Sequence, residues 1–239
     1  MPDVKYRRVL LKISGEALAG EARRGLDFDM IGTVCETIAQ CTAMGVQVGV
    51  VIGGGNFWRG VKDGADRMQR THADSMGMLA TVMNCIAVSD ALEKRGVPSR
   101  VLSAVEMNKF AEYYTYDTAN RYLNEGKVVF FACGTGNPYF TTDTGAVLRA
   151  VEIEADAILL AKNVDGVYSA DPNKDPTAVK YDSLTYDEVL ARHLQATDTT
   201  AMTLAMDNHM TMVCFALKDP QNIIRVLRGE KIGTIVKED

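Results

Sequence analysis

A stretch rich in glycine and threonine, Gly134–Asp143, carries the residue types best suited to binding a ligand. It reads Gly-Thr-Gly-Asn-Pro-Tyr-Phe-Thr-Thr-Asp, after the apolar run Val128–Ala132 and before the periodic apolar run Ala146–Val151. This order predicts a strand, a loop and a helix that Asp143 or a neighbouring Thr caps. Glycines let the backbone approach a ligand, and hydroxyls at a helix N-terminus offer donors to an anion. The alternative interpretation is a capped turn without a ligand.

A lysine at the end of the first predicted strand is the second candidate. Residues 6–13 form an apolar-rich run that Ser14-Gly15-Glu16 ends, which places Lys12 at the carboxyl end of the strand. In an open α/β sheet this end faces the ligand crevice, where a lysine supplies a positive charge to a phosphate. The GxxxxGK[ST] pattern of a P-loop is absent. The alternative is a surface lysine at a strand end.

Three consecutive glycines follow the second predicted strand, residues 46–52. The segment Gly53–Asn56 is costly in backbone entropy, and close approach of the backbone to phosphates is the usual reason for such a segment. Arg59 can add a bidentate phosphate contact. The spacing does not match the dinucleotide-binding pattern GxGxxG. A plain glycine-rich turn is the alternative.

The helix predicted over residues 71–95 carries a fourth candidate, Asp74, in its first turn. Its carboxylate is suited to accept hydrogen bonds from sugar hydroxyls, although an acid near a helix N-terminus is also common without a ligand. A stripe rich in methionine runs along this helix and predicts core or subunit interface rather than a cofactor site. The polar residues 60–70 before the helix predict a mobile segment.

The composition argues against several classes of protein. The 239 residues include 26 Lys and Arg against 31 Asp and Glu, a formal net charge of −5, which argues against general nucleic-acid binding and a polybasic membrane anchor. Five cysteines without a CxxC pair predict reduced thiols, and Cys133 and Cys214 lie in apolar runs expected in the core. The three histidines are isolated, so no metal cluster is expected. The N-terminus does not resemble a signal peptide, and no run of ~20 apolar residues predicts a membrane helix. We therefore expect a cytoplasmic protein.

Strands and helices alternate along the chain. Beyond the segments above, we predict strands at 100–103, 127–132, 157–161, 212–216 and 233–236, and helices at 27–45, 117–125, 143–154, 185–195, 198–209 and 220–228. An Asp-Gly pair within 163–172 predicts a hairpin, and residues 20–25 predict a charged flexible loop. The alternation predicts an α/β fold with a mostly parallel central sheet and helices on both faces. No linker or repeat divides residues 1–239, which we therefore expect to form a single domain.

Several of these segments occur together, and in this order, in a known family. They are Lys12–Glu16, Gly53–Asn56 with Arg59, the helix with Asp74–Thr81, Thr135–Asp143, and Val164–Tyr168 with Asp171-Pro172. From about residue 6 to 236 the chain closely resembles the bacterial uridylate kinases of the amino acid kinase family. The glycine segments are shared by the wider family, whereas Thr135–Asp143 points to the UMP-specific branch.

The resemblance implies a three-layer αβα sandwich that assembles into a homohexamer. It implies reversible transfer of a phosphoryl group from ATP to UMP, giving UDP and ADP in pyrimidine nucleotide biosynthesis. Mg²⁺ would arrive with ATP, without ligands from protein side chains. The N-terminal part of the domain would bind the acceptor and the C-terminal part ATP. GTP would activate the enzyme and UTP would inhibit it.

The resemblance also assigns roles to individual residues. The catalytic residues would be Lys12, Arg59, Asp143 and Asp198, with the two acids orienting Lys12 and nearby groups. ATP would contact Lys12, Ile13, Ser14, Gly15, Gly55, Arg59, the pair Lys162–Asn163, Tyr168 and Asp171. UMP would contact Gly54, Asp74, Thr135, Gly136, Asn137, Pro138, Tyr139, Phe140, Thr141 and Thr142. The GTP-linked segment would be Gly20, Glu21, Ala22, Arg23, Arg24 and Gly25.

Three other functions compete with this interpretation. A related kinase would act on acetylglutamate or carbamate, but the Thr135–Thr142 segment argues against it. A nucleotide-binding regulator or storage protein on the same fold would bind ATP without turnover, but Lys12, Arg59 and Asp143 are all present. A dehydrogenase with a dinucleotide-binding fold would need the fingerprint that this chain lacks.

Overall fold

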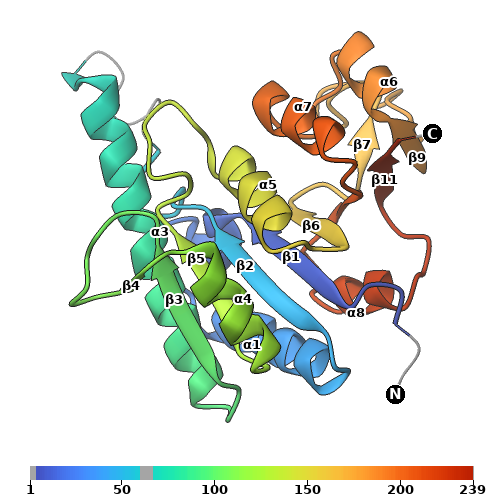
Figure 1. Cartoon of the computed structure of the whole chain (residues 1–239). Helices are drawn as coiled ribbons and strands as arrows, with labels where there is room; N and C mark the ends of the chain where they lie inside the picture. The colour runs from blue at the N-terminus through green and yellow to red at the C-terminus, as the bar shows by residue number, and fades with distance from the viewer. Residues whose placement is uncertain (1–3, 60–66, 239) are drawn as a thin grey trace.

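A nine-stranded sheet forms the centre of the protein (Figure 1). The computed structural model describes residues 4–59 and 67–238, so most of the stretch predicted to be mobile, residues 60–66, lies outside the described residues. The strands of this sheet are β1 Arg8–Ile13, β2 Gln47–Ile52, β3 Ser99–Ser103, β4 Glu112–Tyr113, β5 Val128–Ala132, β6 Ala157–Lys162, β9 Ser183–Thr185, β10 Met212–Ala216 and β11 Thr234–Lys237.

The strands lie in the order β4-β3-β5-β2-β1-β6-β10-β11-β9, and β1 therefore occupies the middle. Adjacent strands are parallel except for β10 and β11, which are antiparallel. At the carboxyl end of β1, Lys12 pairs in register with Val51 of β2 and Leu160 of β6. The central strands are almost continuously buried, as expected for parallel strands covered on both faces. The predicted mostly parallel sheet is confirmed.

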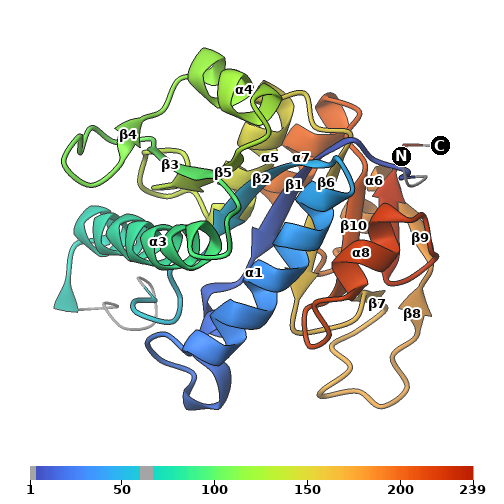
Figure 2. The ribbon, with the colours of Figure 1, turned by 90° about the horizontal axis from the view of Figure 1, so that it is seen from below.

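Helices cover both faces of the sheet. Figure 2 shows α1, α3 and α8 on one side and α4, α5 and α7 on the other. The bounds are η1 Gly15–Ala22 (a 3-10 helix), α1 Phe28–Ala43, α3 Arg70–Glu93, α4 Tyr116–Asn124, α5 Thr142–Glu152, α6 Tyr186–Ala191, α7 Thr199–Asp207 and α8 Asn222–Leu227. Each face has its own buried apolar cluster, one under α1, α3 and α8 and the other under α4, α5, α6 and α7. The three-layer αβα sandwich is therefore confirmed.

The caps of three helices place side chains near the carboxyl ends of the strands. Thr141 caps α5, because its hydroxyl accepts hydrogen bonds from the backbone N–H groups of Asp143 and Thr144 at 3.0 and 3.3 Å. Asp198 caps α7 by accepting from Ala201 N at 2.9 Å. Asp27 caps α1 in the same way. The cap of α5 is thus the neighbouring Thr, which leaves the Asp143 carboxylate available for another contact.

The structure corrects the predictions after β6 and after β1. The predicted hairpin at 163–172 is wrong: β7 Val167–Tyr168 pairs antiparallel with β8 Lys180–Tyr181, across a longer connection. The predicted helix 185–195 is shorter: α6 begins at Tyr186, after its capping residue Thr185, and ends at Ala191, before the positive φ of His193. The predicted flexible loop 20–25 is partly the end of η1, and its backbone turns through positive φ at Gly20, Arg23 and Gly25.

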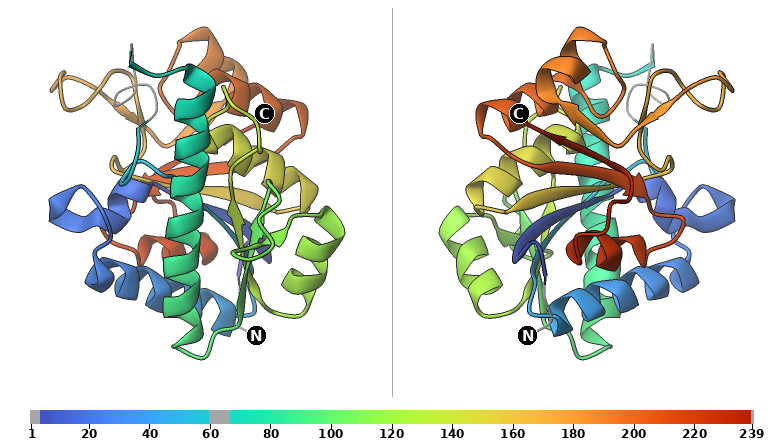
Figure 3. Two further views of the ribbon diagram at one scale, coloured as in Figure 1. Left: turned by 90° about the vertical axis from the view of Figure 1, so that its left-hand side faces the viewer. Right: turned by 90° about the vertical axis from the view of Figure 1, so that its right-hand side faces the viewer.

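Helix α3 stands at one side of the molecule, with one face turned outward in the left view of Figure 3. Ala80 and Leu92 are buried against the sheet, whereas Met76, Leu79, Met83 and Ile86 are exposed. The methionine-rich stripe of α3 is therefore not part of the hydrophobic core at these four positions. Its role as a subunit interface stays a prediction. By length and composition alone, α3 is long and apolar enough to cross a membrane, whereas we expected no membrane helix from the sequence. In the structure, 44% of its most apolar 18-residue window is buried inside the protein.

Candidate functional site

Two loops meet in backbone contact at the carboxyl ends of β1 and β2. A Cβ atom added at Gly15 would lie 2.2 Å from the carbonyl oxygen of Gly53 and 2.5 Å from Oδ1 of Asn56. Only glycine fits at Gly15, because real Cβ atoms do not approach other atoms so closely. Gly53 N donates to Ile13 O at 2.9 Å, which continues the β1–β2 pairing into the loop. The segments Ser14–Glu16 and Gly53–Asn56 therefore form one surface.

A cluster of opposite charges lies at the end of β1. The Lys12 ammonium is 2.5 Å from Oδ1 of Asp143 at the start of α5, and the Lys162 ammonium at the end of β6 is 3.7 Å from Oδ2. The Thr197 hydroxyl donates to Asp143 Oδ2 at 2.7 Å. Lys162 also donates to the carbonyl oxygen of Ala196. The cluster thus joins β1, β6, α5 and the segment before α7.

The charge state of Asp143 follows from these neighbours. Burial, the largest influence, acts to raise the pKa of its carboxyl, but Lys12, Lys162 and the Thr197 hydroxyl together lower that pKa to about 2. The carboxylate is therefore ionised at neutral pH, where it orients the ammonium groups and is too weak a base to remove a proton from a substrate. Asp143 occupies the orienting position that the sequence resemblance implied.

Asp198 contacts different groups from Asp143. Its carboxylate accepts from the hydroxyls of Thr141 at 2.5 Å and Thr144 at 3.0 Å while it caps α7. It contacts the threonines that begin α5. The resemblance implied that the two acids orient Lys12 and nearby groups; in the structure Asp143 contacts Lys12 and Asp198 contacts Thr141 and Thr144, and their roles stay predictions.

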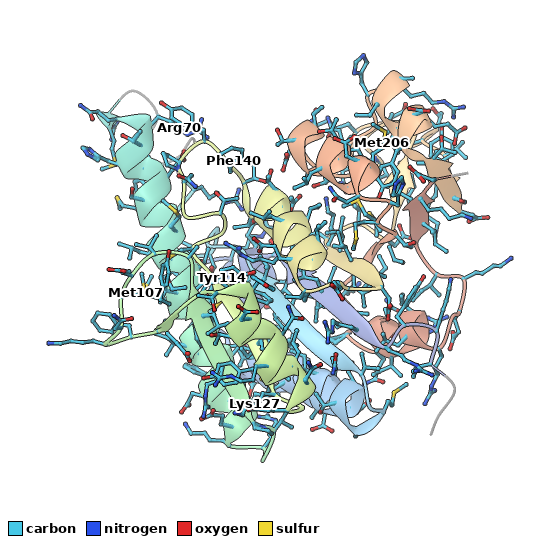
Figure 4. All side chains as sticks on the ribbon, viewed as in Figure 1. Arg70, Met107, Tyr114, Lys127, Phe140 and Met206 are labelled. Carbon is cyan, nitrogen blue, oxygen red and sulfur yellow. The ribbon has the colours of Figure 1, made fainter. Side chains whose placement is uncertain are left out.

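A cavity of about 320 Å³ opens beside this cluster, between α3, the glycine loop and the loop before α5. We call it the α3 cavity. Its lining includes the predicted residues Gly54, Gly55, Arg59, Asp74, Thr135, Asn137, Phe140, Thr141 and Thr142. Figure 4 labels Arg70 on the first turn of α3 and Phe140 in the loop before α5, at the same end of the molecule. Most of the segments predicted to bind UMP therefore line one cavity.

Asp74 is held in place on the wall of the α3 cavity. Its carboxylate accepts from Arg70 Nε at 2.8 Å and from the backbone N–H of Tyr139 at 2.8 Å. The Arg70 guanidinium also lies 5.2 Å from the ring centre of Tyr139. The helix begins at Arg70 rather than Thr71, so Asp74 lies just past its first turn. This carboxylate therefore ties α3 to the loop before α5.

Arg59 also lines the α3 cavity. It forms an ion pair with Glu16, and its Nε donates to Gly55 O at 3.4 Å. Gly54 packs directly on α3, because an added Cβ would lie 2.7 Å from the carbonyl oxygen of Gly77. Gly55 and Arg59, which the resemblance assigned to ATP, thus share a cavity with the residues assigned to UMP.

A second cavity, of about 250 Å³, lies beside β7. We call it the β7 cavity; it is lined by Val164, Gly166, Tyr168, Ser169, Ala170, Asp171, Pro172, His193, Leu194 and Gln195. It contains Tyr168 and Asp171, two of the residues assigned to the ATP base and ribose side. The Tyr168 hydroxyl donates to Asp165 Oδ1 at 2.6 Å, and this bond raises the pKa of Tyr168.

Each cavity has a lining residue that is next in sequence to a residue of the charge cluster. Thr142, which precedes Asp143, lines the α3 cavity, and Gln195, which precedes the Lys162 partner Ala196, lines the β7 cavity. Both cavities therefore adjoin the cluster that contains Lys12. This geometry is suited to transfer of a charged group from one ligand to the other.

Some predicted residues lie outside both linings. Lys12 and Ile13 end β1, and Ser14 and Gly15 lead into η1. Lys162 is the last residue of β6, with its ammonium 3.7 Å from Asp143 Oδ2, and Asn163 follows it. Gly136, Pro138 and Tyr139 belong to the loop of the α3 cavity without lining it. Sequence reasoning missed the wall residues Trp58, Ala73, Gly77, Met78, Thr81 and Cys133, most of which belong to segments whose pattern indicates core, whereas Gly134 belongs to the predicted ligand-binding stretch. It also missed His193, Leu194 and Gln195, which carry no motif.

The segment Gly20–Gly25 is tied to the glycine loop. Asn56 Nδ2 donates to Gly25 O at 2.8 Å, and Gly25 N donates to Asn56 O at 3.0 Å. Asn56 and Asn84 of α3 exchange two amide hydrogen bonds, and Asn84 also donates to Gly53 O at 2.7 Å. Both asparagines are buried. Arg23 and Arg24 are exposed at the tip of the segment.

Within residues 4–59 and 67–238, no group of three or more His, Cys, Asp or Glu side chains is arranged to hold a metal ion. The two carboxylates nearest the glycine loop, Asp143 and Glu16, are each paired with cations. The five cysteines are free and buried, which confirms that Cys133 and Cys214 lie in the core.

Comparison with known proteins agrees with the sequence resemblance. Residues 7–220 match the amino acid kinase family. The chain is 50% identical over 240 residues to the uridylate kinase of Limosilactobacillus reuteri, with both proteins covered completely. It is 34% identical to the UMP kinase of Bacillus anthracis (TM-score 0.94; 98% of this chain and 97% of that chain). It is 36% identical to the UMP kinase of Ureaplasma parvum (TM-score 0.92; 98% and 100%). The chain therefore belongs to the amino acid kinase family.

Proposed function

We propose that this enzyme is a UMP kinase, which transfers a phosphoryl group from ATP to UMP to give ADP and UDP. The observation that carries the proposal is the Lys12–Asp143 ion pair, whose charge cluster adjoins both the α3 cavity and the β7 cavity. The relatives named uridylate kinase or UMP kinase match over almost the whole chain, including the loop that distinguishes this branch.

UMP occupies the α3 cavity in this proposal. The Asp74 carboxylate accepts hydrogen bonds from the ribose, and the hydroxyls and backbone of Thr135–Thr142 contact the base and sugar. Arg59 and the glycine loop lie on the wall where the UMP phosphate faces Lys12. ATP occupies the β7 cavity with its base and ribose near Tyr168 and Asp171, and its phosphates extend toward Lys12–Gly15, Gly55 and Arg59.

The chemistry requires positioning and charge neutralisation more than base catalysis. The attacking oxygen belongs to the UMP phosphate, which is already anionic, so no strong base is needed. Two polyanions must be held in line while negative charge spreads over the transferred group. Lys12 supplies a fixed positive charge there, and Asp143, with a pKa of about 2, keeps the Lys12 ammonium oriented. The N–H groups of the glycine loop and Arg59 add donors.

Mg²⁺ fits this site as an ion carried by the ATP phosphates. Asp143 and Glu16 are both engaged by cations, so phosphate oxygens and water are the better ligands for a hard ion. When bound, the ion neutralises charge on the phosphate oxygens. The protein's contribution is to align the triphosphate against the acceptor.

We also propose that residues 1–239 act as one domain, with acceptor binding in the N-terminal part and ATP binding in the C-terminal part. The α3 cavity is lined by residues between 54 and 142, and the β7 cavity by residues between 164 and 195. We place the enzyme in the cytoplasm, in pyrimidine nucleotide biosynthesis.

The exposed apolar residues Met76, Leu79, Met83 and Ile86 of α3 support assembly into a homo-oligomer, which we expect to be a hexamer. GTP activation through Gly20–Gly25 and inhibition by UTP are the regulation expected of such an enzyme. Sedimentation of the purified protein tests the first point, and added GTP or UTP in the assay tests the second.

The decisive experiment measures ADP release from ATP–Mg²⁺ with UMP, CMP, acetylglutamate and carbamate in parallel. Strong turnover with UMP alone supports the proposal. Turnover with acetylglutamate or carbamate would identify a different kinase of the family. ATP binding without turnover on any acceptor would indicate a nucleotide-binding regulator or storage protein instead.

A further inference from the structure

A buried arginine lies behind the α3 cavity and has no role in the site described above. Arg149, on the inner face of α5, is 5% exposed, and no other charged residue among the described residues is as deeply buried. Removing a charge from water is costly, so a buried arginine needs specific partners. Its partners show what it holds in place.

Two of these partners form a compact polar network. The Arg149 guanidinium is 2.5 Å from Oε2 of Glu152, and the Tyr114 hydroxyl donates to the same oxygen at 2.5 Å. The guanidinium also lies over the Tyr114 ring, 3.8 Å from its centre. Figure 4 labels Tyr114, which lies between β4 and α4. The network therefore fixes the position and the direction of the arginine fork.

The third partner belongs to the wall of the α3 cavity. Arg149 Nη2 donates to the carbonyl oxygen of Gly134 at 3.3 Å, and Gly134 lines the cavity at the start of the Thr135–Thr142 loop. Helix α5 also packs on this residue, because a Cβ added at Gly145 would lie 3.0 Å from the Gly134 Cα. Arg149 thus contacts the wall of the α3 cavity from the side of α5.

The backbone at this point is in a disfavoured conformation. Cys133 and Gly134 both have positive φ, 64° and 55°, and a non-glycine residue with positive φ persists only where its surroundings hold it. On the side of α3, the backbone N–H of Cys133 donates to the Thr81 hydroxyl at 2.8 Å. On the side of α5, Arg149 holds the next carbonyl. The loop is therefore anchored from both helices where it leaves β5.

We infer that Arg149 is a positioning residue for UMP, an inference that rests on the proposed function. It acts through the Gly134 carbonyl and sets the path of the loop that lines the α3 cavity. Arg149 itself lines neither the α3 cavity nor the β7 cavity. Its loss is therefore expected to weaken UMP binding more than ATP binding.

Lysine is the informative replacement at this position. An arginine fork can reach Glu152 and Gly134 with different nitrogens, whereas a single ammonium cannot reproduce that fork. Arg149→Lys therefore keeps the positive charge beside Glu152 and loses the Gly134 contact. We expect the UMP KM to rise about tenfold, which corresponds to about 1.4 kcal/mol, while the ATP KM changes less than about twofold.

Glu152→Gln is the matched control. It weakens the ion pair with the buried arginine but leaves the Arg149–Gly134 hydrogen bond in place. We expect a lower Tm with the UMP KM within about twofold of the parent. A purely structural role for Arg149 would instead lower the Tm of both variants and leave both KM values unchanged.

A double variant keeps the test informative if Arg149→Lys does not fold. Arg149→Met with Glu152→Leu removes both charges, and replacing a buried ion pair by apolar groups is often tolerated. It also lacks the Gly134 contact, so the same selective rise in UMP KM is expected.

The outcomes separate this inference from the proposed function. An unchanged UMP KM in a folded Arg149→Lys or double variant, or an equal rise in Glu152→Gln, would overturn the positioning role. Absence of UMP turnover in the parent enzyme would overturn the proposed function and this inference together.

Discussion

The Lys12 ammonium lies 2.5 Å from Oδ1 of Asp143, so the middle strand of the sheet and the first turn of α5 are joined by an ion pair. The Lys12 side chain is 12% exposed and is held by this ion pair rather than free in solvent. In the proposed function, the ion pair positions the charge that meets the transferred phosphoryl group.

Replacing this lysine tests its role in the reaction. We expect Lys12→Ala to lower kcat by ~10²-fold or more, the scale of losing one transition-state donor. Steady-state kinetics on the folded variant, checked by circular dichroism, measures this effect. Normal turnover would show that the charge is not needed.

The pH dependence of stability reports the Asp143 contacts. Its pKa is lowered from 3.8 to about 2 in the folded protein, so the stabilisation is present above pH ~4 and is lost as the pH falls toward 2. The shift corresponds to roughly 2 kcal/mol. We expect Asp143→Asn to reduce the free energy of unfolding at pH 7 and the difference from the parent to shrink below pH 4. Urea unfolding at several pH values measures both, and a constant difference would contradict this account.

Asp74 distinguishes the two ends of the site. Its carboxylate lines the α3 cavity and accepts a hydrogen bond from Tyr139 N. Asp74→Asn keeps the shape of the side chain but weakens both the hydrogen bond to Tyr139 N and the proposed hydrogen bonds to the ribose. We expect the UMP KM to rise about tenfold, as for loss of a charged hydrogen bond, and the ATP KM to change little. Initial rates with each substrate varied in turn measure the two values. A selective rise in the ATP KM would reverse the assignment of the cavities.

The glycine contact between the first two loops makes a prediction about stability. A Cβ at Gly15 would lie 2.2 Å from Gly53 O, so Gly15→Ala must push two loops apart and is expected to cost about 1–3 kcal/mol. Gly77→Ala in α3 is the control, since its added Cβ has no neighbour closer than 4.0 Å and alanine favours a helix. Thermal unfolding of the two variants gives the comparison. Equal Tm values would show that the loops can separate without cost.

The sequence predicts the strands that carry the site because their signals are local. The strands that end at Ile13, Ile52 and Ala132 are apolar runs followed by a glycine within two residues, and their predicted bounds differ from the structure by at most two residues. The pairing of β7 with β8 is not local, since the connecting segment has no alternating pattern that would identify a partner strand. Thr81 and Cys133 belong to runs that indicate core, so their place on a cavity wall becomes visible only once α3 lies beside β5. Arg149 lies in an apolar helix stretch, and the sequence does not show that its side chain points inward.

The amide pair of Asn56 and Asn84 has a consequence for communication within the enzyme. Gly25 cannot shift without breaking two hydrogen bonds to Asn56 or carrying the glycine loop with it. If the glycine loop binds phosphate as proposed, a ligand that moved Gly20–Gly25 would also change the affinity of that loop for phosphate. Because such coupling is reciprocal, phosphate bound at the glycine loop would then change the affinity of Gly20–Gly25 for that ligand by the same factor.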